Sequence, residues 1–172
     1  MIRNIITVKG ITPHIDDTSW VADNATVTGD VVIGKECSIW FQTVIRGDCN
    51  KIIIGNNVNI QDGSMVHGTV GRGDTVLGDN VSVGHRAIIH GCHIEPNVLI
   101  GMGAIILDDV IIPSNTIIAA GALVTSGMKI ESGYIYAGVP AKKLKAIDEV
   151  TAQIYIEGTS KHYVEYKKWY NV

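Results

Sequence analysis

The chain has 172 residues, of which 46% are hydrophobic and 18% are charged, so it can bury a core and is not disordered. Its 14 basic and 17 acidic residues give a net charge of −3, and no basic run is interleaved with aromatics, which excludes an electrostatic footprint for nucleic acid. Residues 1–17 lack the apolar run of a signal peptide and no segment reaches the length of a membrane span, so we expect a soluble, cytoplasmic protein with no membrane partner.

A six-residue repeat begins at residue 21. Aliphatic residues occupy positions 21, 27, 33, 39 and 45, then 54, 60 and 66, then 77, 83 and 89, and finally 94, 100, 106, 112, 118 and 124. The fourth residue after nearly all of these is small or β-branched, and Cys37 and Cys49 fall at this position, so we predict that both fill the core. A period of six is too short for paired helices and too regular for a sandwich, and it predicts a parallel β-solenoid.

In this repeat the sequence resembles the hexapeptide-repeat proteins. The resemblance implies an all-β solenoid, a left-handed parallel β-helix whose triangular prism takes three hexads, or about 18 residues, per coil. Labelling the three faces X, Y and Z in chain order places the hexads that start at 45, 54 and 60 on faces X, Y and Z. Equivalent residues of successive coils then lie about 4.8 Å apart, so side chains form columns.

The column geometry assigns three histidines to faces of the prism. His67 and His90 both directly follow the start of a hexad on face X, one coil apart, and should stack on each other. His85 lies on face Z and can meet them only across an interface between chains. A homotrimer of parallel prisms would therefore close a three-histidine site between neighbouring subunits.

The repeat is interrupted next to these candidate residues. Nine residues separate positions 45 and 54, eleven separate 66 and 77, and five separate 89 and 94. The longest interruption, "GTVGRGDTV" at 68–76, follows His67 directly. We expect either a mobile loop beside the site or a plain hairpin.

Three neutral imidazoles with an open position are the ligand set of a catalytic zinc ion. The segments "VIRGDCN" (44–50), "NVNIQDGSMVH" (57–67) and "GHRAIIHGC" (84–92) resemble the γ-class carbonic anhydrases and their bacterial relatives. The resemblance implies metal-dependent reversible hydration of carbon dioxide to bicarbonate by a metal-bound hydroxide at trimer interfaces. It implies zinc as the metal, and imidazole ligands also suit iron or cobalt.

Residue by residue, the resemblance implies that the metal ligands are His67, His85 and His90, that Gln61 orients the bound hydroxide, and that the remaining site residues are Arg46, Asp48, Asp62 and Asn59. Of the last four, Arg46, Asp48 and Asp62 match an interfacial ion-pair network, and Asn59 matches a polar residue near the substrate. From the columns alone, Arg46 shares the column of His67, and Asp62 lies under His85. An interfacial salt bridge with a purely structural role is the alternative for the charged residues.

The chain departs from the most active γ-class enzymes in the residues that move protons. Where a shuttling glutamate is expected, this sequence has Cys49, and Asp74 is the only acid in the 68–76 loop. Turnover could therefore be slow, or the substrate could be a different small molecule. Tyr134 and Tyr136 are candidates to approach the site.

The hexads end at Pro140, which divides the chain into a β-helix domain, 1–140, and a C-terminal helical tail, 141–172, packed on the prism. Within this tail the apolar residues at helical spacing are Leu144, Ile147, Val150 and Ile154. Gly158 is expected to interrupt the helix.

Two other functions remain open at this stage. One is a hexapeptide-repeat acyltransferase, in which a single histidine acts as general base and a cleft between prisms holds a coenzyme A thioester. The other is a non-catalytic metal-binding or scaffold protein built on the same trimer. Metal content separates the carbonic anhydrase from the acyltransferase, because an acyltransferase has no need for three histidine ligands.

Overall fold

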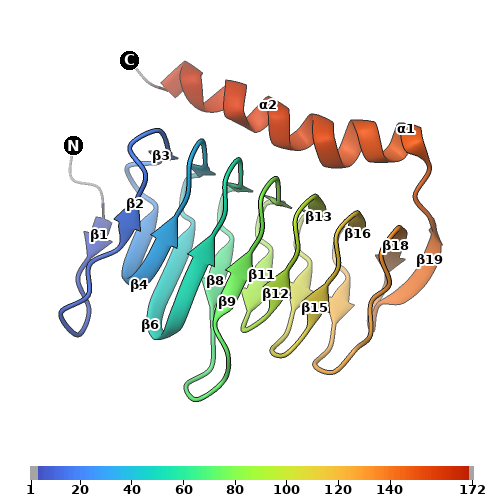
Figure 1. The fold of residues 1–172 in the computed structure, drawn as a ribbon, viewed down its shortest axis with the longest axis horizontal. Helices are drawn as coiled ribbons and strands as arrows, with labels where there is room; N and C mark the ends of the chain where they lie inside the picture. Colours follow the sequence, from blue (N-terminus) through green and yellow to red (C-terminus); the bar gives the residue numbers. More distant parts are fainter. Residues whose placement is uncertain (1–3, 171–172) are drawn as a thin grey trace.

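The computed structural model describes residues 4–170, which form a left-handed parallel β-helix of about seven coils with one C-terminal helix lying along it (Figure 1). This confirms the predicted fold class. Within these residues, no helix has both the length and the apolar character needed to span a membrane. The cytoplasmic location stays a prediction.

The strands belong to two sheets. The larger sheet consists of β1 (Asn4–Ile6), β2 (His14–Ile15), β4 (Thr26–Ile33), β6 (Val44–Ile54), β8 (Met65–His67), β9 (Thr75–Leu77), β11 (Ile88–His90), β12 (His93–Ile94), β14 (Ile105–Ile106), β15 (Ile111–Ile112) and β17 (Leu123–Val124). The smaller sheet consists of β3 (Trp20–Val21), β5 (Ser38–Ile39), β7 (Asn59–Ile60), β10 (Ser82–Val83), β13 (Val98–Ile100), β16 (Thr116–Ile118), β18 (Tyr134–Ala137) and β19 (Lys142–Ala146).

The two sheets make the three faces of the prism. Strand β6 turns a corner: its first residues pair with β8 and its last residues, Ile52–Ile54, pair with β9. The larger sheet therefore covers face X, which contains β8, β11, β14 and β17, and face Y, which contains β9, β12 and β15. The smaller sheet is face Z. His67 and His90 end strands on face X, whereas His85 follows β10 on face Z, as predicted.

The hexad positions build the core. Every predicted inward aliphatic residue from Val21 to Val124 is buried. Cys37 is buried as predicted, but Cys49 is only half-buried, so its prediction as a core residue is wrong. The cause is the nine-residue interval between 45 and 54, whose three extra residues lift Cys49 out of the hexad register.

The corner at β6 needs glycine. Gly29 has a φ of +74°, and a Cβ atom there would collide with the backbone oxygen of Gly47 in the next coil. The pairing of β4 with β6 shifts register at this point, between Gly29 and Val31. Bulges of this kind re-aim the residues that follow, here Asp48 and Cys49.

The C-terminal segment differs from its prediction in two places. Leu144 lies in β19, which pairs antiparallel with β18, and Ile147 also precedes the helix, which begins after its N-cap Asp148. The helix comprises α1 (Glu149–Thr151), a π-helical stretch η1 (Ala152–Gly158), α2 (Thr159–Tyr166) and a 3₁₀ turn η2 (Lys167–Tyr170). Gly158 does not interrupt it, because its backbone is helical and the widened π turn accommodates the residue. The division of domains at residue 140 stays a prediction.

Polar anchors attach the helix to the prism. Lys167 is 4% exposed, and its Nζ donates to the Thr18 oxygen at 2.7 Å and to Glu36 Oε2 at 2.6 Å. Ser160 Oγ donates to the Asn57 oxygen at 3.0 Å, and the rings of Tyr163 and Trp40 pack edge to face. The helix thus lies at a fixed place beside face Z.

We expect Lys167→Met to lower the free energy of unfolding by about 1–3 kcal/mol, because the Thr18 carbonyl and Glu36 lose a buried charged donor. Lys161→Met is the matched control: Lys161 pairs with Glu157 on the exposed side of the same helix, and its loss should change stability by about 0–0.5 kcal/mol. Urea denaturation of both variants measures the difference. Equal stabilities would contradict the anchoring role of Lys167.

Candidate metal centre

Two histidines face each other on face X. His67 and His90 are paired in register on β8 and β11, with ring centroids 5.3 Å apart, which confirms the predicted stacking. His67 Nδ1 lies 3.3 Å from His90 Nε2. Two nitrogens bound to one tetrahedral zinc ion lie roughly 3.3 Å apart, so the pair has the spacing of two metal ligands.

The outer nitrogen of each ring is held by a carboxylate. His67 Nε2 lies 3.0 Å from Asp48 Oδ1, and His90 Nδ1 lies 2.9 Å from Asp108 Oδ2. Carboxylates in this position fix the ring orientation and tautomer of metal-binding histidines. The inner nitrogens, His67 Nδ1 and His90 Nε2, therefore face each other and are the pair that a shared three-histidine site would use.

Arg46 completes this group, which we call the X half-site (Arg46, Asp48, His67, His90 and Asp108). Its guanidinium donates to Asp48 Oδ2 at 2.5 Å and approaches His67 Nδ1 at 3.3 Å. Burial opposes ionisation of Asp48, but hydrogen bonds from Arg46, His67 and Cys49 outweigh it and lower the pKa of Asp48 to about 2. Asp48 is thus a carboxylate at neutral pH.

The second group, the Z half-site (Asn59, Gln61, Asp62 and His85), lies on face Z. His85 Nδ1 is 2.8 Å from Asp62 Oδ2, so the predicted stacking of these two residues is confirmed. Gln61 Nε2 donates to Asn59 Oδ1 at 3.0 Å, and Asn59 Nδ2 donates to Ser82 Oγ at 2.7 Å. These bonds fix which end of the Gln61 amide faces outward.

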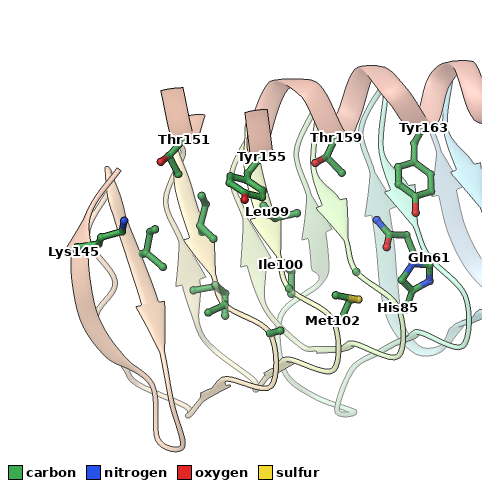
Figure 2. A pocket seen from close by; sticks show the side chains of 17 residues that line it. Gln61, His85, Leu99, Ile100, Met102, Lys145, Thr151, Tyr155, Thr159 and Tyr163 are labelled. Atoms are coloured by element: carbon green, nitrogen blue, oxygen red, sulfur yellow. The ribbon is translucent and has the colours of Figure 1, made fainter. Parts of the chain in front are cut away.

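The Z half-site opens into a cavity of about 560 Å³ between face Z and the C-terminal helix. Figure 2 shows Gln61 and His85 at one end, with Tyr163 of α2 pointing toward them. Burial raises the pKa of Tyr163 to about 12, and Asp62 and Tyr166 act in the same direction, so its hydroxyl stays protonated. The floor is apolar and includes Leu99, Ile117 and Ile135.

One chain does not bring the three predicted ligands together. Within residues 4–170, Asp48, Cys49 and His67 bring three ligand atoms within 4.8 Å of one another, and His85 does not form such a group with the other histidines. This agrees with the prediction that His85 belongs to a different face. The role of all three as metal ligands stays a prediction.

Asp108 and Tyr163 were missed by the sequence analysis. Asp108 lies two residues after a hexad start on face X, one coil beyond His90, so the column rule that found Asp62 could have found it. Gly91 makes room, because a Cβ atom there would collide with the Asp108 carboxylate. No signal in the sequence indicated that Tyr163 reaches the Z half-site, since that contact depends on where the helix packs.

Tyr134 and Tyr136 do not line this cavity, although they were candidates for the site. Both lie on β18, near the C-terminal end of the prism. The Tyr134 ring packs under Lys143 Nζ, and the buried Tyr136 hydroxyl accepts a hydrogen bond from the Glu131 amide. Their contacts are structural.

The 68–76 loop is tied to the prism beside the X half-site. Asn50 Nδ2 donates to the backbone oxygens of Thr69, Arg72 and Gly73 at 2.7–2.9 Å. Arg72 also pairs with Asp109, next to Asp108. The loop is therefore anchored at both its start and its tip, and it is the protrusion between β8 and β9 in Figure 1.

Comparison with known proteins identifies the family. The family model described as "Bacterial transferase hexapeptide (six repeats)" matches residues 91–126. The chain is 40% identical over 169 residues to "Gamma carbonic anhydrase 2, mitochondrial" of Arabidopsis thaliana, covering 94% of this chain and 60% of that one. It is 53% identical over 100 residues to a carbonic anhydrase of Geobacillus kaustophilus, covering 58% and 54%. The chain belongs to the γ-class carbonic anhydrase-like family.

This confirms the resemblance drawn from the motifs, although the chain spans only 54–60% of the length of these two curated relatives. A solved structure, the hexapeptide transferase family protein of Anaplasma phagocytophilum, superposes with a TM-score of 0.93 at 39% identity and covers 99% of both chains. Membership of the γ-class family implies a metal cofactor, and three histidines with one carboxylate each fit such a group.

We expect Asp108→Asn to weaken metal binding by about 10- to 100-fold, because His90 loses the charged partner that orients its ring. Asp109→Asn is the matched control, since Asp109 pairs with Arg72 rather than with a histidine, and asparagine tolerates its φ of +64°. Competition with a coloured chelator measures both affinities. Equal affinities would show that Asp108 does not position His90.

Proposed function

We propose that the protein is a γ-class carbonic anhydrase that hydrates carbon dioxide reversibly at metal sites shared between the subunits of a homotrimer. The observation that carries the proposal is the paired arrangement of the histidines. His67 and His90 face each other at 3.3 Å with their outer nitrogens held by carboxylates, and His85 is held in the same way on another face. This arrangement supports a three-histidine ligand set that is divided over two surfaces.

The surfaces next to the two half-sites are complementary in character. On face X, partly exposed apolar side chains stack beside the histidine pair in the column Met65, Ile88, Ile105 and Leu123. On face Z, the apolar cavity next to His85 includes Met102, which is 58% exposed. Packing the column of one subunit against the cavity of the next buries both and carries His85 toward the histidine pair.

Where the X half-site of one subunit meets the Z half-site of the next, the chain's own residues would have separate roles. Gln61, whose Nε2 donates to Asn59, presents its Oε1 as a hydrogen-bond acceptor beside the reacting oxygen. Asp48 holds the His67 ring at Nε2, and Arg46 in turn holds Asp48. A bound zinc, iron or cobalt ion supplies a Lewis acid that lowers the pKa of a water ligand toward about 7.

An acyltransferase is the second candidate function, because the superposed structure is named as a hexapeptide transferase family protein. An acyltransferase needs one general base, and nothing in that chemistry calls for three histidines that each have their own carboxylate. The histidine arrangement therefore favours the hydration of carbon dioxide.

The experiment has two parts. Protein purified without chelators or a nickel column is analysed for metal, and stopped-flow hydration of carbon dioxide is compared for metal-loaded and chelator-treated protein. We expect close to one metal ion per chain and activity that depends on it. Metal-free protein that transfers an acyl group from a coenzyme A thioester would support the second candidate, and metal-loaded protein without either activity would support a binding role.

A further inference from the structure

Cys49 has no part in the proposed reaction, yet it lies beside the X half-site. Its Sγ, an oxygen of Asp48 and a ring nitrogen of His67 all lie within 4.8 Å of one another. Two consecutive residues of a regular strand point to opposite faces, so Asp48 and Cys49 reach the same histidine only because of the register shift at the corner of β6.

We propose that Asp48, Cys49 and His67 form a second metal site, complete within one chain, that binds thiophilic divalent ions such as cadmium, cobalt and zinc. A thiolate, a carboxylate and an imidazole are a donor set that these ions accept, and the thiolate favours the softer ones. The site goes beyond the proposed function and does not depend on a trimer.

The present contacts show where the ion fits. Asp48 Oδ1 and His67 Nε2 are 3.0 Å apart, close to the spacing of two ligands on one tetrahedral ion, and the ligand atoms of Asp48, Cys49 and His67 all lie within 4.8 Å of one another. Arg46 holds the other oxygen, Oδ2, and leaves Oδ1 available. The ion takes the place of the proton shared by Asp48 and His67 and of the thiol proton of Cys49.

Charge and protons balance. The Cys49 thiol loses its proton to solvent and binds as a thiolate, so the thiolate and the Asp48 carboxylate neutralise the divalent ion. His67 stays neutral: its proton moves to Nδ1, and Nε2 becomes the ligand. Asp48 and Cys49 are both half-buried, so an ion can enter without unfolding.

The two metal sites compete for His67. The three-histidine site uses His67 Nδ1, which faces His90, whereas the second site uses His67 Nε2, which faces Asp48. A neutral imidazole has one lone pair available for a metal, so the ring serves one site at a time. An ion that prefers Cys49 therefore removes His67 from the catalytic set.

The test titrates Cd²⁺ into His85→Ala protein, in which the three-histidine site is incomplete, and records thiolate-to-cadmium charge-transfer absorption in the ultraviolet. We expect the absorption to saturate at one ion per chain. Adding Cys49→Ser or His67→Asn should abolish the absorption or weaken binding at least tenfold. Cys92→Ser is the matched control and should leave the absorption unchanged, because burial raises the pKa of Cys92 to about 12 and shields it.

No absorption in His85→Ala protein, or absorption that survives Cys49→Ser, would overturn the proposal. Circular dichroism and thermal unfolding establish that each variant is folded; Cys49 is half-buried and its replacement leaves no large cavity. Because His85 is absent throughout, the result is independent of whether the trimer hydrates carbon dioxide.

Discussion

Mixed trimers of His67→Ala and His85→Ala subunits are expected to regain about a quarter of the metal sites that either variant alone has lost. In the proposed trimer each site needs an intact X half-site from one subunit and an intact Z half-site from its neighbour, because the two groups lie on different faces of one chain. In a random equal mixture, about one interface in four combines the two intact halves. Each parent alone retains at most two of the three histidines at every interface.

The measurement is zinc content at limiting chelator after the two proteins are unfolded and refolded together. Both carry Cys49→Ser as well, so that the single-chain site contributes nothing. The control mixes His67→Ala with His90→Ala, which damage the same half-site and should restore no sites. If the first mixture binds no more zinc than the second, although heterotrimers are demonstrated by mass spectrometry, the ligands are not divided between chains.

The hexad period predicted most of the fold because in a solenoid one local rule repeats. An aliphatic residue at each hexad start and a small residue four positions later specify the buried column coil after coil, as the fully buried Ile45, Ile60 and Ile89 show. The same rule assigned His67 and His90 to one column and Asp62 to the column of His85. The separation of two residues along the chain predicts their distance in the structure wherever the number of residues per coil is known.

The hexad rule gave wrong predictions, or none, for residues whose contacts are not set by the repeating coil. Cys49 was assigned to the core because hexad counting ignores the three extra residues at the β6 corner, where Gly29 and Gly47 let the chain change register. Tyr163 could not be placed, because the helix reaches the Z half-site through long-range anchors such as Lys167 with Thr18. Leu144 was taken as helical although pairing with β18 holds it in a strand.

The position of Cys49 also leads to a second prediction, a large increase in kcat. We expect Cys49→Glu to raise kcat for carbon dioxide hydration by on the order of a hundredfold, because a carboxylate there can carry away the proton that each turnover releases. The structure makes the substitution tolerable, since the side chain is half-buried and lies beside the site rather than in the core.

The kinetic pattern distinguishes proton transfer from a general improvement of the site. A shuttle acts after the chemical step, so kcat should rise while kcat/KM stays nearly unchanged, and an external buffer such as imidazole should raise kcat of the unmodified protein in the same way. Cys49→Gln is the matched control: it has nearly the same shape as glutamate but cannot exchange a proton, and it should remain as slow as the unmodified protein and equally dependent on buffer. All three proteins are compared as folded, metal-loaded trimers. If kcat of Cys49→Gln rises as much as that of Cys49→Glu, the loss of the thiol is responsible, because removing it ends the competition for His67. If kcat rises in neither variant and buffer has no effect, proton release does not limit turnover.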